Sequence, residues 1–249
     1  MSPSLFAYTI DEDPFHLFST SHLVVLLLFV VLTAALFVYR KKCRSSARSR
    51  HTLRYTLAAT LLLTEIAFQL WHLWTESWSL AYTLPLQLCS VSLLLAIIML
   101  YTRSYTLYEL TFFAGIGGAA QAMLTPELFY PFPHFRFIHF FLAHAAIIWA
   151  CLFMTWVEGY RPTLRSVWKT MGFLNVLLLV ALLVNHFTGG NYLFVSHKPE
   201  NPSLIDYLGE YPWYILSLEG VALAVFLLLY WPFAWGKKAI SSSSQEMSS

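Results

Sequence analysis

The chain has 249 residues, of which 58% are hydrophobic and only 11% are charged, with a formal net charge of +2. Soluble domains carry about 25% charged residues, so this composition excludes a soluble globular protein and predicts a polytopic membrane protein. The three cysteines have neither a CxxC nor a Cys/His metal spacing, which argues against a disulfide framework and a structural zinc site.

Seven stretches of the chain are long and apolar enough to cross a bilayer as α-helices, which takes about 20 residues each. In chain order, they are residues 22–39, 55–74, 83–101, 105–124, 137–156, 168–186 and 212–233. The predicted fold class is therefore an all-α, seven-helix transmembrane bundle over residues 22–236. We expect an external segment over residues 1–21 and a disordered, polar cytoplasmic tail over residues 237–249.

The basic residues predict how the bundle is oriented. Thirteen of the 15 Lys and Arg residues lie in the connections that follow the first, third, fifth and seventh stretches, and only Arg136 and Lys198 lie on the other side. Because Lys and Arg concentrate in cytoplasmic loops, we expect the N-terminus outside and the C-terminus inside. The external connection over residues 187–211 is too long for a simple turn, so we interpret it as a possible lid.

Polar side chains concentrate in the outer halves of the predicted helices. Glu65, Gln69 and His72 share one face of the second helix, and Cys89 lies about two turns inside the outer end of the third. The other polar residues near this depth are Gln121, His139, His144, Asn185 and Glu219. A common depth predicts an outward-facing polar chamber, because residues that only join helices could lie at any depth. The alternative is that they only hydrogen-bond neighbouring helices, for about 0.6 kcal/mol each.

Cys89 is the candidate nucleophile of this chamber, and His144, at a similar depth, is the candidate base that takes its proton. A thiol near headgroup depth can reach the ester carbonyl of a glycerolipid. The predicted chemistry is acyl transfer from membrane phospholipids, through a thioester on Cys89, to an alcohol or an amine. The supporting roles stay open: the candidates are Gln87, Gln121 and Asn185 as oxyanion donors, and Glu65 and Glu219 as groups that orient the histidine.

Four motifs, taken together, resemble a known family of membrane proteins. They are Leu84-Pro85-Leu86-Gln87-Leu88-Cys89-Ser90, Thr125-Pro126-Glu127-Leu128, Phe141-Leu142-Ala143-His144 and Asn185-His186-Phe187-Thr188-Gly189-Gly190-Asn191-Tyr192. Over about residues 16–230, the chain is similar to the bacterial YwaF-like integral membrane proteins and to their eukaryotic relatives, the proteins named transmembrane protein 164. The last motif adds Asn191 to the supporting residues.

The resemblance implies a lipid acyltransferase that moves a fatty acyl chain from phosphatidylcholine to a lyso-ether phospholipid. For the eukaryotic branch, the resemblance implies that this transfer passes through a cysteine with a histidine partner. Cys89 and His144 are the matching positions in this sequence.

The leading interpretation is therefore a cysteine-dependent phospholipid acyltransferase or acyl hydrolase of a bacterial plasma membrane. We expect no metal, no cofactor and no nucleic-acid partner, and the sequence does not predict the oligomeric state. A non-enzymatic alternative is a seven-helix transporter or receptor, in which Glu65, His72 and Glu219 would bind a small solute. A metal-dependent hydrolase is the least favoured interpretation, because it needs histidines of suitable spacing to converge on one ion. The histidines concerned are His72, His139, His144 and His186.

Overall fold

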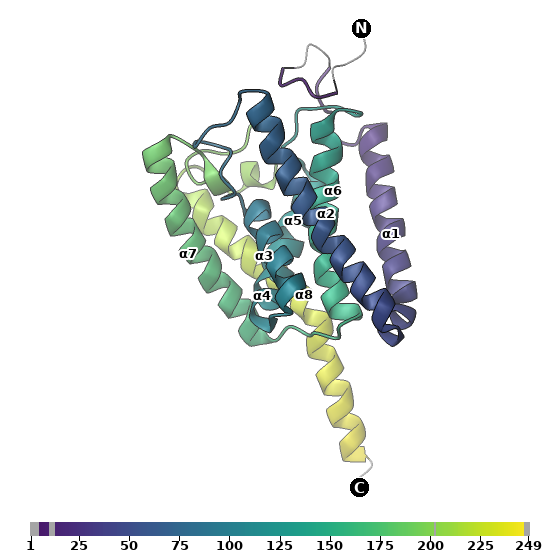
Figure 1. The fold of residues 1–249 in the computed structure, drawn as a ribbon. Coiled ribbons are helices and arrows are strands. Elements are labelled where there is room, and N and C mark those ends of the chain that lie inside the picture. The colour runs from purple at the N-terminus through teal and green to yellow at the C-terminus, as the bar shows by residue number, and fades with distance from the viewer. Residues whose placement is uncertain (1–4, 10–12, 202, 247–249) are drawn as a thin grey trace.

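The computed structural model describes residues 5–9, 13–201 and 203–246, with side chains described up to residue 235. Every regular element in these ranges is helical, which confirms the predicted all-α class (Figure 1). The α-helices are α1 (Thr20–Ser45), α2 (Ala47–Trp74), α3 (Leu88–Thr102), α4 (Tyr105–Leu110), α5 (Ile116–Leu124), α6 (Phe135–Trp156), α7 (Leu164–Thr188) and α8 (Trp213–Glu246). The shorter elements are the π-helical turn η1 (Thr111–Gly115) and the 3-10 turns η2 (Tyr192–Phe194) and η3 (Leu204–Tyr207).

Five of these helices are long and apolar enough to cross a membrane. They are α1, α2, α6, α7 and, between Trp213 and Trp235, α8. The helix α3 is also apolar but has only 15 residues. The elements α4, η1 and α5 follow one another without a break from Tyr105 to Leu124, which matches the fourth apolar stretch of the sequence. The fold is therefore that of a multi-pass membrane protein.

The connections between the helices lie at two opposite ends of the bundle (Figure 1). The end of the bundle at which the chain starts, called the N-terminal end below, holds the N-terminal segment and the three longer connections, which precede α3, α6 and α8. The C-terminal end holds the shorter connections between α1 and α2, between α3 and α4, and between α6 and α7. The disorder expected for residues 237–249 stays a prediction: their side chains are not described, and residues 247–249 lie outside the described part of the chain.

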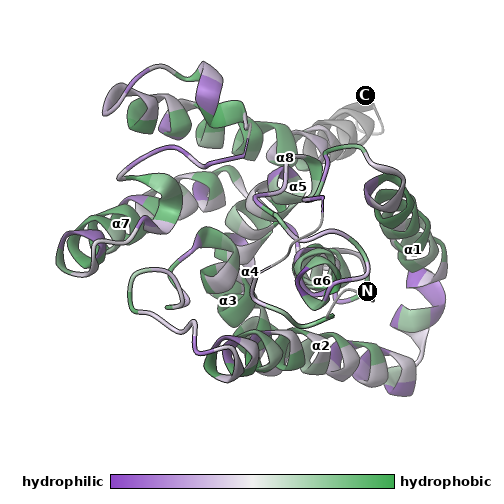
Figure 2. Cartoon of the chain, turned by 90° about the horizontal axis from the view of Figure 1, so that it is seen from above, coloured by the Kyte–Doolittle hydropathy of each residue, from purple (hydrophilic) through white to green (hydrophobic). Residues whose placement is uncertain are grey.

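The central helix of the bundle is α6, with α1, α2, α3 and α5 packed around it (Figure 2). Apart from Arg136, His139, His144 and Thr155, its side chains are apolar, which is typical of a helix that other helices surround. Ala143, Ala146 and Ala150 are buried along it, and such small side chains let neighbouring helices approach closely. The helices α7 and α8 pack against each other beside this core.

Two glycines bring α5 and η1 close to the neighbouring helices. A Cβ atom at Gly115 would lie 3.0 Å from Ile147 Cγ2 of α6 and 3.6 Å from Ser92 Cβ of α3. A Cβ atom at Gly118, about one turn further along, would lie 3.8 Å from the Cys89 sulfur. A larger side chain at Gly115 would therefore need the Ile147 and Thr111 side chains to shift.

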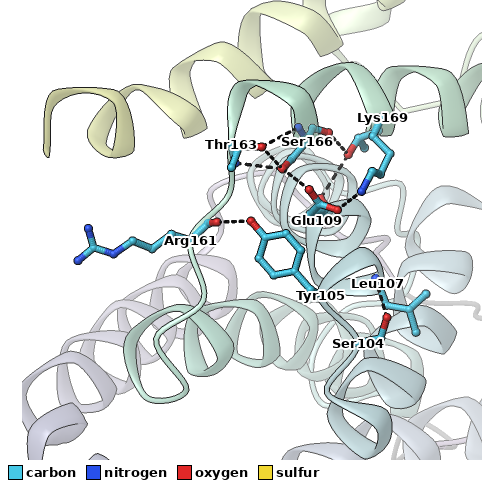
Figure 3. A network of polar contacts seen from close by, with 9 residues as sticks. Ser104, Tyr105, Leu107, Glu109, Arg161, Thr163, Ser166 and Lys169 are labelled. Carbon is cyan, nitrogen blue, oxygen red and sulfur yellow. Dashed lines mark hydrogen bonds and ion pairs between the residues drawn. The ribbon is translucent and has the colours of Figure 1, made fainter. Parts of the chain in front are cut away.

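A buried ion pair joins α4 to α7 at the C-terminal end (Figure 3). Glu109 is 3% exposed, and its carboxylate pairs with the Lys169 ammonium and accepts a 2.6 Å hydrogen bond from the Ser166 hydroxyl. The Thr170 hydroxyl donates to the Glu109 backbone carbonyl at 3.2 Å. A buried carboxylate is costly unless it is paired and hydrogen-bonded, and Glu109 meets both conditions.

Replacing Lys169 by Met should destabilise the protein by about 2 kcal/mol, because it leaves a buried carboxylate without its cation. This loss of stability is smaller than the loss expected for a fully buried ion pair, since the Lys169 side chain is 37% exposed. Unfolding in mixed detergent micelles measures the change. Adding Glu109→Gln should recover most of the loss, and Arg165→Met, on an exposed position of the same helix, should have little effect. A Lys169→Met variant as stable as the wild type would contradict this account.

Candidate functional site

Cys89 is the second residue of α3 and lies in the first turn of that helix. The sequence predicted a helix from residue 83, with Cys89 about two turns inside it, and this prediction was wrong. Residues 83–87 form a non-helical turn. Pro85 accounts for part of this difference, because a proline disfavours helical backbone at Leu84, the residue before it. The correction moves Cys89 from the body of a helix to its N-terminus.

The first turn of α3 has free backbone N–H groups. Gln87 is the N-cap residue, but its side chain makes no cap hydrogen bond and instead accepts one from the Leu193 N–H at 3.0 Å. No hydrogen-bond acceptor among the described residues pairs with the N–H groups of Leu88, Cys89 and Ser90. Such groups, at the positive end of a helix dipole, favour a negative charge. Beside a thiol, they can stabilise an oxyanion, a role that the sequence had suggested only for side chains.

Tyr192 holds the turn that precedes α3. Its hydroxyl accepts a hydrogen bond from the Leu84 N–H and donates one to the Leu80 carbonyl, both at 2.9 Å. Tyr192 is itself fixed by Asn185, whose side chain accepts from its N–H at 2.8 Å and donates to its carbonyl at 3.1 Å. Asn185 therefore has a structural partner, and the motif over residues 185–192 supports the start of α3.

The same motif contains two further supports. A Cβ atom at Gly190 would lie 2.2 Å from the Ala81 carbonyl oxygen, so only glycine lets the two segments approach this closely. The Asn191 side-chain oxygen accepts hydrogen bonds from the N–H groups of Ser196 and His197, at 3.0 Å and 3.2 Å. Asn191 thus shapes the backbone of the loop that follows it.

The possible lid over residues 187–211 is fastened to the N-terminal end of the bundle. The Glu127 carboxylate accepts hydrogen bonds from the backbone N–H groups of Glu200 at 3.0 Å and Asn201 at 3.1 Å. The Asn201 side chain donates to the Leu128 carbonyl at 3.3 Å. Burial raises the pKa of Glu127, while the two N–H groups act against this rise. One carboxylate of the second motif therefore anchors the middle of the loop.

His144 lies on α6 and is 8% exposed. Its Nδ1 atom is 2.6 Å from the Phe140 carbonyl oxygen, and because a carbonyl can only accept, Nδ1 carries the proton. In the neutral ring, Nε2 is then left as an acceptor, which is the form that a general base needs. A backbone carbonyl therefore orients this ring, in the role for which the sequence had suggested Glu65 or Glu219.

Cys89 and His144 lie at a similar level of the bundle. Gly115 marks a point where Ser92 of α3 and Ile147 of α6 come together. Cys89 lies one turn from Ser92, and His144 one turn from Ile147, in both cases towards the N-terminal end. No hydrogen bond joins the Cys89 thiol to the His144 ring in the described structure. The two side chains thus share a level on packed helices without direct bonding.

The other predicted site residues have hydrogen-bond partners of their own, at 2.7–3.1 Å. The pairs are Gln69 with Glu65, His72 with Ser77, Gln121 with Thr125, His139 with the Thr64 carbonyl, and Glu219 with Asn175. None of these bonds reaches Cys89 or His144. By their hydrogen bonds, these residues therefore form separate pairs.

A cavity of about 360 Å³ lies at the N-terminal end, between the N-terminal segment and the end of α2. Its lining residues are Leu5, Phe6, Ala7, Tyr8, Trp74 and Thr75, and none of them is a predicted site residue. In the described ranges, no group of three or more His, Cys, Asp or Glu side chains is arranged to hold a metal ion. Neither feature adds a residue to the site around Cys89.

Replacing Tyr192 by Phe should destabilise the protein by about 1–3 kcal/mol, because it leaves the Leu84 N–H and the Leu80 carbonyl without their shared partner. The midpoint of thermal unfolding in detergent measures this loss. Tyr207→Phe is the matched control, since that side chain is 87% exposed, and its midpoint should not change. Equal midpoints for Tyr192→Phe and the wild type would show that the hydroxyl does not hold the turn.

Comparison with known proteins extends over most of the chain. The model of the TMEM164 family matches residues 17–230, which include α1 to α7, much of α8 and all four motifs. No curated protein and no solved structure matched the chain. The family match agrees with the resemblance that the motifs indicated. The chain therefore belongs to the TMEM164 family.

Proposed function

We propose that this chain is a membrane-embedded phospholipid acyltransferase or acyl hydrolase, in which Cys89 is the nucleophile and His144 is the base. The observation that carries the proposal is the position of Cys89 at the uncapped start of α3, near the level of a histidine whose Nε2 can accept a proton. Membership of the TMEM164 family and the resemblance of the motifs to the acyltransferases of that family support it.

The proposal includes seven membrane crossings, with the N-terminus outside. The two crossings added to the five long helices are α3 and the continuous run from α4 to α5. Thirteen of the 15 basic residues lie in the connections and tail at the C-terminal end, which favours a cytoplasmic position for that end. Cys89 would then lie on the external side of a bacterial plasma membrane, near the depth of phospholipid ester groups.

In the first half-reaction, His144 Nε2 takes the proton of the Cys89 thiol as the sulfur forms a bond to the carbonyl carbon of an acyl ester. The free N–H groups at the start of α3 stabilise the resulting oxyanion. The ester C–O bond then breaks, and the lysophospholipid oxygen takes the proton from His144. The acyl chain stays on Cys89 as a thioester.

In the second half-reaction, His144 takes a proton from the hydroxyl group of an acceptor, whose oxygen bonds to the thioester carbonyl. The C–S bond breaks, and the sulfur recovers the proton. A lysophospholipid acceptor gives transfer, whereas water gives hydrolysis. His144 is buried beside the Phe140 ring, whose centroid is 4.2 Å from its own, and such apolar surroundings favour a lipid acceptor over water.

The purified chain should release lysophosphatidylcholine from phosphatidylcholine and transfer the acyl group to an added lyso-ether phospholipid. Cys89→Ala should abolish both reactions, because it removes the sulfur that carries the acyl group. Cys43→Ala is the matched control, since this half-buried cysteine lies near the C-terminal end, and it should keep full activity. Full activity in Cys89→Ala would contradict the assignment. Loss of function in Glu65→Gln alone would favour the transporter or receptor.

His144→Asn should lower kcat by about 100-fold or more, because it removes the proton acceptor. The asparagine amide can still donate to the Phe140 carbonyl in place of Nδ1, so the helix should be little disturbed. Steady-state kinetics should therefore show a change in kcat with KM nearly constant. A variant with the kcat of the wild type would exclude His144 as the base.

A further inference from the structure

Arg136 lies in the first turn of α6, at the N-terminal end of the bundle, and has no carboxylate partner in the described ranges. No carboxylate lies within 4.0 Å of its guanidinium in the described part of the chain. Four carboxylates of this end have contacts elsewhere: Asp13 pairs with His16, Glu65 accepts from Gln69, and Glu127 and Asp206 accept from backbone N–H groups. Among the residues that the structure describes, none therefore compensates the positive charge of Arg136.

The guanidinium is turned towards α2 and is held there. Its central carbon lies 4.6 Å from the centroid of the Phe68 ring and 5.7 Å from that of Trp71. One N–H group donates to His139 Nδ1 at 3.0 Å. His139 is fixed in turn, because its Nε2 donates to the Thr64 carbonyl at 3.1 Å. This arrangement orients the fork of the guanidinium and keeps it from extending freely to the membrane surface.

The contacts of Arg136 leave most of its hydrogen-bonding capacity unused. A guanidinium has several N–H donors, and within the described residues only the one that faces His139 has a side-chain acceptor. His139 gives no negative charge, because a ring that donates through Nε2 and accepts through Nδ1 is neutral. A half-buried cation among aromatic rings and neutral groups is costly unless an anion joins it.

We propose that Arg136 binds the phosphate group of a ligand, most simply the headgroup phosphate of a phospholipid. The planar fork of a guanidinium matches two phosphate oxygens, and such charge-assisted bonds are strong in apolar surroundings. His144 follows Arg136 by eight residues on α6, which is about 12 Å along the helix. In a glycerophospholipid, the acyl esters lie deeper than the phosphate. A phosphate on Arg136 would therefore direct them towards the level of His144 and Cys89, a step that rests on the proposed function.

Lipid binding tests this proposal without any turnover. The affinity of the full chain in a neutral detergent is measured for dioctanoyl phosphatidylcholine and for dioctanoylglycerol, which lacks the phosphate. Arg136→Met should weaken phosphatidylcholine binding at least about tenfold and leave dioctanoylglycerol binding unchanged. The phosphatidylcholine affinity of Arg136→Lys should lie between those of the wild type and Arg136→Met, because lysine keeps the charge but lacks the guanidinium fork. Lys198→Met removes the other basic residue of this end, in the loop, and should have no effect.

Equal losses for both lipids, or no loss for phosphatidylcholine in Arg136→Met, would overturn the proposal. Thermal unfolding of Arg136→Lys checks that the fold is kept. Competition with millimolar inorganic phosphate shows whether the site binds free phosphate or a lipid headgroup. If phosphate displaces phosphatidylcholine from the wild type, the site is assigned to free phosphate. If it does not, the site is assigned to the lipid headgroup. Cys89→Ala should bind phosphatidylcholine like the wild type. Arg136-dependent phosphatidylcholine binding in a wild-type chain that shows neither acyl transfer nor hydrolysis would contradict the proposed catalysis alone.

Discussion

The start of α3 depends on the hydroxyl group of Tyr192. By bonding both to Leu80 and to Leu84, this group joins the turn before α3 to a loop more than 100 residues later in the chain. The turn is thus fixed from outside the helix, and Gln87 does not need to cap it. The N–H groups of the first turn stay free as a consequence, and the proposed role of Cys89 depends on them.

The second half of the candidate site comes from the central helix. The ring of His144 is oriented by the carbonyl of Phe140 within the same helix and so has an orienting partner that is not a carboxylate. The same helix carries Arg136 about two turns nearer the N-terminal end. Helix α6 thus carries the Arg136 cation, the neutral His144 base and the surface that packs against α3. Its rigid position gives these groups a fixed order along the bundle.

The long apolar stretches allowed the all-α fold to be predicted, because the apolar length needed to cross a membrane is visible in any sequence. The start of α3 was mispredicted because Pro85 lies inside an apolar run. The free N–H groups and the Phe140 carbonyl are backbone atoms, so they cannot be predicted from the types of residue in the sequence. Tyr192 lay within a recognised motif, but only the fold shows that its hydroxyl reaches Leu84.

The predicted polar chamber shows a second limit of sequence reasoning. The distance of a residue from a helix end indicates its depth in the membrane, but it does not indicate which neighbouring helix the side chain faces. Glu219 illustrates this, since it pairs with Asn175 of α7 and has no bond to the site residues of α3 or α6. Residues near one depth can thus form several separate pairs. Cys89 and His144 share a level of the bundle, because each lies one turn from a residue that packs at Gly115, and their pairing stays a proposal.

The central claim is that the acyl chain passes through the sulfur of Cys89. The most direct test is to incubate the chain with phosphatidylcholine in the absence of an acceptor, stop the reaction with acid and determine the mass of the peptide that contains Cys89. We expect one acyl group on this peptide, which hydroxylamine removes and which does not form in His144→Asn. Lysophospholipid release without an acyl group on this peptide, or with the acyl group on Cys43 or Cys151, would contradict it.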